Sequence, residues 1–178
     1  MSNVNEYFLL KQDERYNRTP IIVDLFKKID KRNISREKSF KIPNILILNI
    51  RKEEKINFID VLDSPLFLVN KSMRDILKKY DTNIIFKNIA LLDHVEKKQG
   101  NYVLPILEEV DALSNDSILN LDRSVVKKIV LDKKKIEGKK IFKIKGIAKN
   151  LIVVRLDVAE SLLRRKYVGM KLDRLEIK

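Results

Sequence analysis

Short apolar runs separated by charged stretches follow one another along this chain, and few of them are long enough to form a helix. Runs of this length that are rich in Ile, Val and aromatic residues are typical of β-strands. The pattern predicts strands at residues 7–10, 45–50, 56–62, 67–69, 84–86, 89–92 and 102–106, and three more in the last third. We therefore predict an α+β fold, with a mixed or mostly antiparallel sheet and a few short helices.

One helical pattern stands out in the N-terminal part. Ile22, Leu25, Phe26 and Ile29 recur at helical spacing, and Pro20 stands where a first helical turn tolerates proline. A short helix is predicted there. The charged residues 30–42 that follow have no period, which predicts a loop.

Two segments repeat the same succession of features. Residues 67–86 read FLVNKSMRDILKKYDTNIIF, and residues 151–172 read LIVVRLDVAESLLRRKYVGMKL. Ser72 with Asp75, and Asp157 with Glu160, occupy the two positions of a capping box. The chain is therefore predicted to contain two similar strand–cap–helix–strand units.

The exposed positions of the two units differ. Lys78 and Lys79 of the first unit correspond to Leu163 and Arg164 of the second. Because the shared features are apolar strands and caps, they predict that both units serve as scaffold and that a partner binds elsewhere.

The sequence between and after these units predicts further local structure. A turn is expected at KKQGN around Gly100, and the acidic residues 108–117 are expected to form a loop. The runs KKIVLD, IFKIKG and LIVVRL predict a meander of three strands. Within IFKIKG, Phe142 and Ile144 should face inward while Lys143 and Lys145 face outward.

At 178 residues the chain is long enough for one domain with a substantial core. Residues 67–178 are predicted to be the main domain. Residues 1–66 are an N-terminal part, either a small subdomain or, in the favoured interpretation, a portion of one globular unit. The chain has no cysteine, no signal peptide and no uncharged run long enough for a bilayer. These features predict a soluble, cytoplasmic protein.

The formal net charge of +13 is distributed unevenly. Residues 1–66 carry +3, residues 67–122 carry −2, and residues 123–178 carry +12. Most of the charge in the last third comes from a series of lysines between residues 127 and 149. Such a series is typical of a surface for an acidic protein partner or, equally, of a solvated strand face. Nucleic acid is less favoured, because the series contains no arginine and Phe142 is expected to face inward.

Groups that could carry catalysis are sparse. His94 is the single histidine, which excludes His-pair metal sites, and the four isolated glycines exclude a phosphate-binding loop. Glu137, Lys139 and Asp132 superficially match the end of a metal-dependent nuclease site, but Glu137 and Lys139 flank a glycine in a turn. We predict no catalytic residue, no metal site and no cofactor.

Several motifs together resemble a known family. They are YFLL at residues 7–10, FLVNKSMRDIL at 67–77, YVLPILEEVDALSNDS at 102–117, VVKKIVLDKKKIEGKKIFKI at 125–144 and IVVRLDVAESLLRRKYVGMKL at 152–172. Their order and spacing are similar to the bacterial immunity proteins of polymorphic toxin systems, in the branch first catalogued as a domain of unknown function in myxobacterial toxin loci. Two positions depart from the family pattern. Ser114 stands where a second Asp is common, and Asp157 replaces the usual Ser cap.

The resemblance implies a non-enzymatic, cytoplasmic inhibitor that binds and neutralises a cognate toxin effector by occlusion. The alternative is a nucleic-acid-binding module that uses the lysine-rich last third. The residues expected to bind the partner are Lys133, Lys134, Lys135, Lys139, Lys140, Lys143 and Lys145.

Overall fold

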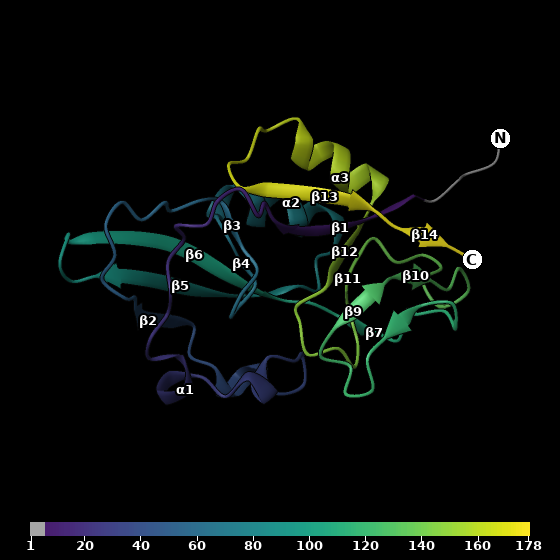
Figure 1. Cartoon of the computed structure of the whole chain (residues 1–178), viewed down its shortest axis with the longest axis horizontal. Coiled ribbons are helices and arrows are strands. Elements are labelled where there is room, and N and C mark those ends of the chain that lie inside the picture. The colour runs from purple at the N-terminus through teal and green to yellow at the C-terminus, as the bar shows by residue number, and fades with distance from the viewer. Residues whose placement is uncertain (1–5) are drawn as a thin grey trace.

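The computed structural model describes residues 6–178 and shows two five-stranded sheets with short helices on either side (Figure 1). The sheets contain both parallel and antiparallel pairs. This arrangement confirms the predicted α+β fold with mixed sheets and few helices. No helix in residues 6–178 is long and apolar enough to cross a membrane.

One sheet, named here the β1 sheet, has the strand order β13-β1-β12-β11-β7. Its strands are β1 (Tyr7–Gln12), β7 (Glu109–Val110), β11 (Ile141–Ile144), β12 (Ile152–Arg155) and β13 (Met170–Arg174). Strand β1 is antiparallel to β12 on one side and to β13 on the other, so the first described strand lies inside the sheet.

The other sheet, named here the β5 sheet, has the strand order β2-β5-β6-β4-β3. Its strands are β2 (Ile45–Asn49), β3 (Val61–Leu62), β4 (Leu68–Val69), β5 (Ile85–Asp93) and β6 (Lys98–Ile106). Two small ribbons complete the fold: β8 (Ile118–Leu119) with β9 (Val126–Lys128), and β10 (Val130–Leu131) with β14 (Glu176–Ile177).

Residues 67–86 and 151–172 form two units with the same topology. In the first unit, helix α2 (Lys71–Tyr80) joins β4 to β5, and both strands run antiparallel to β6, which lies between them. In the second, helix α3 (Leu156–Leu163) joins β12 to β13, and both run antiparallel to the intervening β1. The two predicted strand–helix–strand units are therefore present.

Helices α2 and α3 lie side by side in opposite directions. Ser72, near the start of α2, is 3.0 Å from the hydroxyl of Tyr167, which follows α3. Tyr80, at the end of α2, donates its hydroxyl to the backbone oxygen of Asp157 in the first turn of α3 (3.0 Å). Both helices contribute to one buried cluster with strands of the two sheets, including Met73, Leu77, Val103, Val154, Val158 and Leu162. Together they form a helical layer on one side of the strands (Figure 1).

The predicted helix caps are wrong in both units. Asn70 caps α2, because its side-chain oxygen accepts from the Met73 backbone N–H (2.7 Å) and its amide donates to Asp60 (2.7 Å). Ser72 and Asp75 lie already inside the helix. In the second unit Arg155 is at the cap position, and no side chain accepts a capping hydrogen bond there.

Replacing Asn70 with alanine should lower the free energy of unfolding by about 0.5–2 kcal/mol, because it leaves the backbone N–H of Met73 without its hydrogen-bond acceptor. Ser72→Ala is the matched control. That variant removes only an exposed hydrogen bond to Tyr167 and should change stability by less than about 0.5 kcal/mol. Urea denaturation of both variants measures the two losses of stability, and the loss should be larger for Asn70→Ala. If Ser72→Ala were the more damaging change, the capping-box prediction would be reinstated.

The helix predicted at residues 20–29 is mostly absent. Only Leu25–Lys28 forms a helical turn, α1, while Ile22 makes a β-bridge with Ile50 instead. Leu25 and Ile29 are buried beneath the β5 sheet, but Phe26 is 87% exposed. Because Ile22 pairs with Ile50, directly after strand β2, the first half of the segment does not form a helix. The residues 30–42 predicted as a loop contain two short 3-10 turns, Lys31–Asn33 and Ser39–Lys41.

The turn predicted around Gly100 is also misplaced. Strands β5 and β6 form one long hairpin that turns at residues 94–97, and Gly100 lies within β6 opposite Leu91. A Cβ at position 100 would collide with the ring of Phe58. The glycine is therefore needed for close packing against that ring.

The predicted three-stranded meander is only partly formed. Strands β11 and β12 pair as expected, but β10 pairs with the C-terminal strand β14. Phe142 and Ile144 are buried as predicted. The opposite face of β11 is covered as well, since Ile141 belongs to the core beneath the helical layer.

Candidate partner-binding surfaces

The lysine-rich turn at residues 132–140 is held in place from within the fold. The buried ring of Tyr7 on β1 reaches this turn, and its hydroxyl lies 2.7 Å from the backbone oxygen of Lys139 and 3.2 Å from that of Ile136. Burial raises the pKa of Tyr7, so the hydroxyl keeps its proton and donates it. Asp132 shapes the start of the turn by accepting from the Lys134 N–H (2.9 Å).

Three of the seven predicted partner-binding lysines are already paired with the acidic residues 108–111. Lys135 lies 3.3 Å from Asp111, Lys139 lies 2.5 Å from Glu108, and Lys143 lies 3.1 Å from Glu109. The parallel pairing of β7 with β11 sets this register, because it places Lys143 opposite Glu109. The acidic stretch thus neutralises part of the lysine series inside the protein itself.

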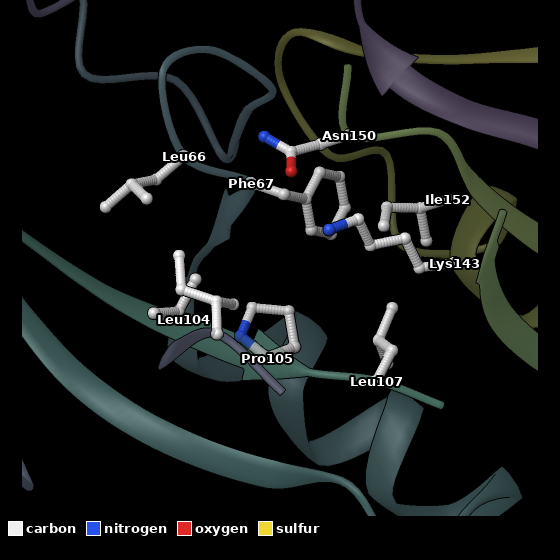
Figure 2. A pocket seen from close by; sticks show the side chains of 9 residues that line it. Leu66, Phe67, Leu104, Pro105, Leu107, Lys143, Asn150 and Ile152 are labelled. Atoms are coloured by element: carbon white, nitrogen blue, oxygen red, sulfur yellow. The ribbon is translucent and has the colours of Figure 1, made fainter. Parts of the chain in front are cut away.

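The side chain of Lys143 is also largely buried. Its side chain is only 21% exposed and extends into a small pocket at the junction of the two sheets, among Phe67, Pro105 and Leu107 (Figure 2). The pocket volume is about 20 Å³, which is enough for a single water molecule. This site is part of the packing between the sheets and is too small for a ligand.

The other four predicted lysines have no carboxylate partner within the described part of the chain. Lys133 and Lys134 lie in the turn beside the C-terminal strand, where the Lys133 N–H donates to the Lys178 carbonyl (2.7 Å). Lys140 lies over the ring of Tyr80 at the end of α2, 6.0 Å from its centroid, and Lys145 follows β11. The structure does not bring the seven lysines together as one free cationic surface.

A second group of cations is concentrated on the helical layer, and sequence analysis missed it. These residues, named here the layer cations, share exposure and the absence of an ion-pair partner in residues 6–178. They are Lys71, Lys78, Lys79, Arg164, Arg165 and Lys166. Lys71, Lys78 and Lys79 lie on α2, and Arg164, Arg165 and Lys166 follow the end of α3. Because the two helices are antiparallel, Lys71 lies at the end of the layer where α3 ends, whereas Lys78 and Lys79 lie at the opposite end.

Nearby carboxylates offset this charge only in part. Asp75 pairs with Arg74 (2.8 Å), and Asp157 pairs with Arg155 (2.8 Å). The hydrogen bond from Arg155 lowers the pKa of Asp157, so this carboxylate is ionised but already satisfied. Glu160 is the acidic side chain of α3 that has no ion pair with described residues. The layer therefore keeps an excess of positive charge.

The groups considered for catalysis are dispersed. His94 is exposed in the β5–β6 turn with its Nε2 2.6 Å from the Asn49 side-chain oxygen. Glu137 is exposed, whereas Lys139 is bound to Glu108, so the nuclease-like set does not converge. Within residues 6–178, no three His, Asp or Glu side chains lie close enough together to hold a metal ion.

Comparison with known proteins gives no further assignment. No family model matches the chain, and no curated protein matches it.

Proposed function

We propose that this protein is an immunity protein of a polymorphic toxin system, which binds a cognate toxin effector in the cytoplasm and neutralises it by occlusion, without catalysis. The observation that carries the proposal is the excess of unpaired positive charge on the helical layer. The family-like motifs at residues 67–77 and 152–172 contribute the two helices of that layer.

A rigid charged layer suits a protein inhibitor. Met73, Leu77, Val158 and Leu162 are almost completely buried beneath it, so the cations are displayed on a packed support. Complementary charge accelerates encounter and rejects wrong partners, while a few buried anchors provide most of the affinity. The layer cations replace the lysines at residues 133–145 as the first candidate surface.

The test starts from the neighbouring gene, which should encode a large secreted protein with a toxin-like C-terminal domain. Expressing that domain alone should arrest growth, and expressing this protein with it should restore growth. The purified pair should form a stable complex. If the protein neither binds the domain nor protects the cell, the proposal is wrong.

The nucleic-acid alternative is tested by the same purified protein. We expect no binding to a short DNA duplex or single strand at low salt. Tight binding whose logarithm falls steeply with the logarithm of salt concentration would instead support a nucleic-acid-binding module.

A further inference from the structure

Strand β13 ends the β1 sheet with an open edge five residues long. It is antiparallel to β1 along its whole length, and the hydrogen bonds made by residues 169 and 175 also reach the β1 side. Because the backbone groups of a strand alternate in direction, residues 171 and 173 bond toward β1. Met170, Leu172 and Arg174 therefore direct their N–H and carbonyl groups outward. No hydrogen bond within residues 6–178 satisfies these outward groups.

At the corresponding edge of the β5 sheet, other parts of the chain block outward groups of β2. The Asn49 N–H donates to the Asp24 carboxylate (2.9 Å), and the Asn49 carbonyl accepts from the Val23 N–H (3.0 Å). The Lys28 ammonium donates to the Ile47 carbonyl (2.9 Å). Covering an exposed edge in this way hinders pairing with another chain. Since β13 has no such cover from the described residues, its edge can accept an added strand.

The sequence of β13 is complementary to itself when two copies run antiparallel. If a twofold axis passes at Leu172, Lys171 of each copy lies opposite Asp173 of the other, so the same pair forms twice. Opposite charges directly across two strands stabilise the pairing, and like charges destabilise it. Moving the axis by one residue would place two copies of Lys171, or two copies of Asp173, opposite each other. Charge therefore selects both the second copy as partner and the register.

Lys171 and Asp173 are exposed enough to make this contact. Each side chain is 40% exposed, on the face of the β1 sheet opposite α3. Lys171 lies 3.8 Å from Asp173 and 3.9 Å from Glu14, whereas Asp173 is held by Lys11 at 2.8 Å. The ammonium of Lys171 thus has no close carboxylate within residues 6–178 and gains one from the second copy.

The α3 side of the same strand adds apolar surface to the edge. Met170 and Leu172 are only partly buried against the helical layer, and Leu163 of α3, which lines the same hollow of about 450 Å³, is 59% exposed. Charges of both signs also line the hollow: Asp13, Glu14, Arg15, Glu160 and Lys171. The hollow by itself therefore favours neither an acidic nor a basic occupant, and the strand edge decides what binds.

We propose that two copies of this chain pair along β13, antiparallel and with the twofold axis at Leu172, so that the two β1 sheets become one continuous sheet. The axis is perpendicular to the sheet, which places both helical layers on the same side of the dimer. The inference uses only the strand edge and does not depend on the proposed function. If the helical layer binds a partner, the dimer presents two such surfaces in one direction.

Sedimentation of the full-length protein over a range of concentrations gives the first test. Physiological salt limits the repulsion between two chains of net charge +13, because the Debye length is then about 8 Å. We expect a monomer–dimer equilibrium in the micromolar range. As the dimer forms, hydrogen exchange should slow at the amides of Met170, Leu172 and Arg174 but not at those of Lys171 and Asp173, which already bond to β1. A monomer at every concentration up to about 1 mM, or a dimer without this protection, overturns the proposal.

Exchanging the charges tests the register. Lys171→Asp and Asp173→Lys each place like charges opposite one another, so each variant alone should dimerise at least about tenfold more weakly. In an equimolar mixture every cross-strand pair is again an Asp opposite a Lys, and a heterodimer should form. Lys149→Asp changes the net charge as Lys171→Asp does, but away from the edge, and should dimerise normally.

Melting curves confirm that the variants are folded before they are compared. Lys171→Asp is decisive even if Asp173→Lys proves unstable, because Lys171 has no close carboxylate in its own chain to lose. Dimerisation of Lys171→Asp at the wild-type strength contradicts the proposed pairing. So does a mixture of the two folded variants that fails to associate.

Discussion

Replacing Leu77 with alanine should lower the free energy of unfolding by about 2–5 kcal/mol, the range for a fully buried leucine. Leu77 is completely buried in the cluster that joins α2 to α3 and to strands of both sheets. The truncation would leave a cavity that the surrounding secondary structure cannot easily fill, because the helices are held at both ends by Tyr80 and Tyr167.

Lys78→Ala provides the matched control. Lys78 is the next residue on the same helix, but it is exposed and has no ion pair with the described residues. Its replacement should change stability by no more than about 0.5 kcal/mol. Chemical denaturation of both variants gives the comparison. A cost below about 1 kcal/mol for Leu77→Ala would mean that the helical layer is not packed as the structure shows.

Reversing four layer cations should slow association with the toxin domain by about 10- to 1,000-fold at low salt. The variant carries Lys78→Glu, Lys79→Glu, Arg164→Glu and Arg165→Glu. It replaces attraction with repulsion on the surface that we propose docks the acidic partner. Stopped-flow or surface-based kinetics would measure the rate, and the effect should shrink as salt is raised.

A control with the same change in net charge separates local from global electrostatics. Lys133, Lys134, Lys145 and Lys149 are also exposed and lack ion pairs within residues 6–178. Reversing these four should slow association much less. If the control associated slowly and the layer-cation variant associated at the normal rate, the partner site would lie on the lysine-rich stretch that the sequence pattern favours. Melting curves of both variants should show folded protein.

Much of the scaffold can be predicted from local patterns in the sequence. The alternation in IFKIKG correctly predicts that Phe142 and Ile144 are buried, and the repeated strand–helix–strand succession correctly predicts two equivalent units. These features depend on neighbours a few residues away, which a sequence displays directly. The failure at residues 20–29 arises where a distant partner intervenes: Ile22 bridges to Ile50, and this contact competes with the helix.

The candidate surface was harder to predict because it depends on distant pairings. Glu108 and Glu109 neutralise Lys139 and Lys143 only because β7 pairs with β11 in one particular register. Conversely, Lys71 and Arg164 lie at the same end of the helical layer only because α2 and α3 pack side by side in opposite directions. The differences between exposed positions of the two units favour a scaffold role for both. In the structure, Lys78, Lys79 and Arg164 at those positions carry charge that no described carboxylate satisfies.

The central claim is that the helical layer binds the partner. Hydrogen exchange of the protein alone and in complex with the toxin domain tests it most directly. We expect new protection at residues 71–80 and 156–172, with little change at residues 132–145. Protection confined to residues 132–145, with the two helices unchanged, would contradict the claim.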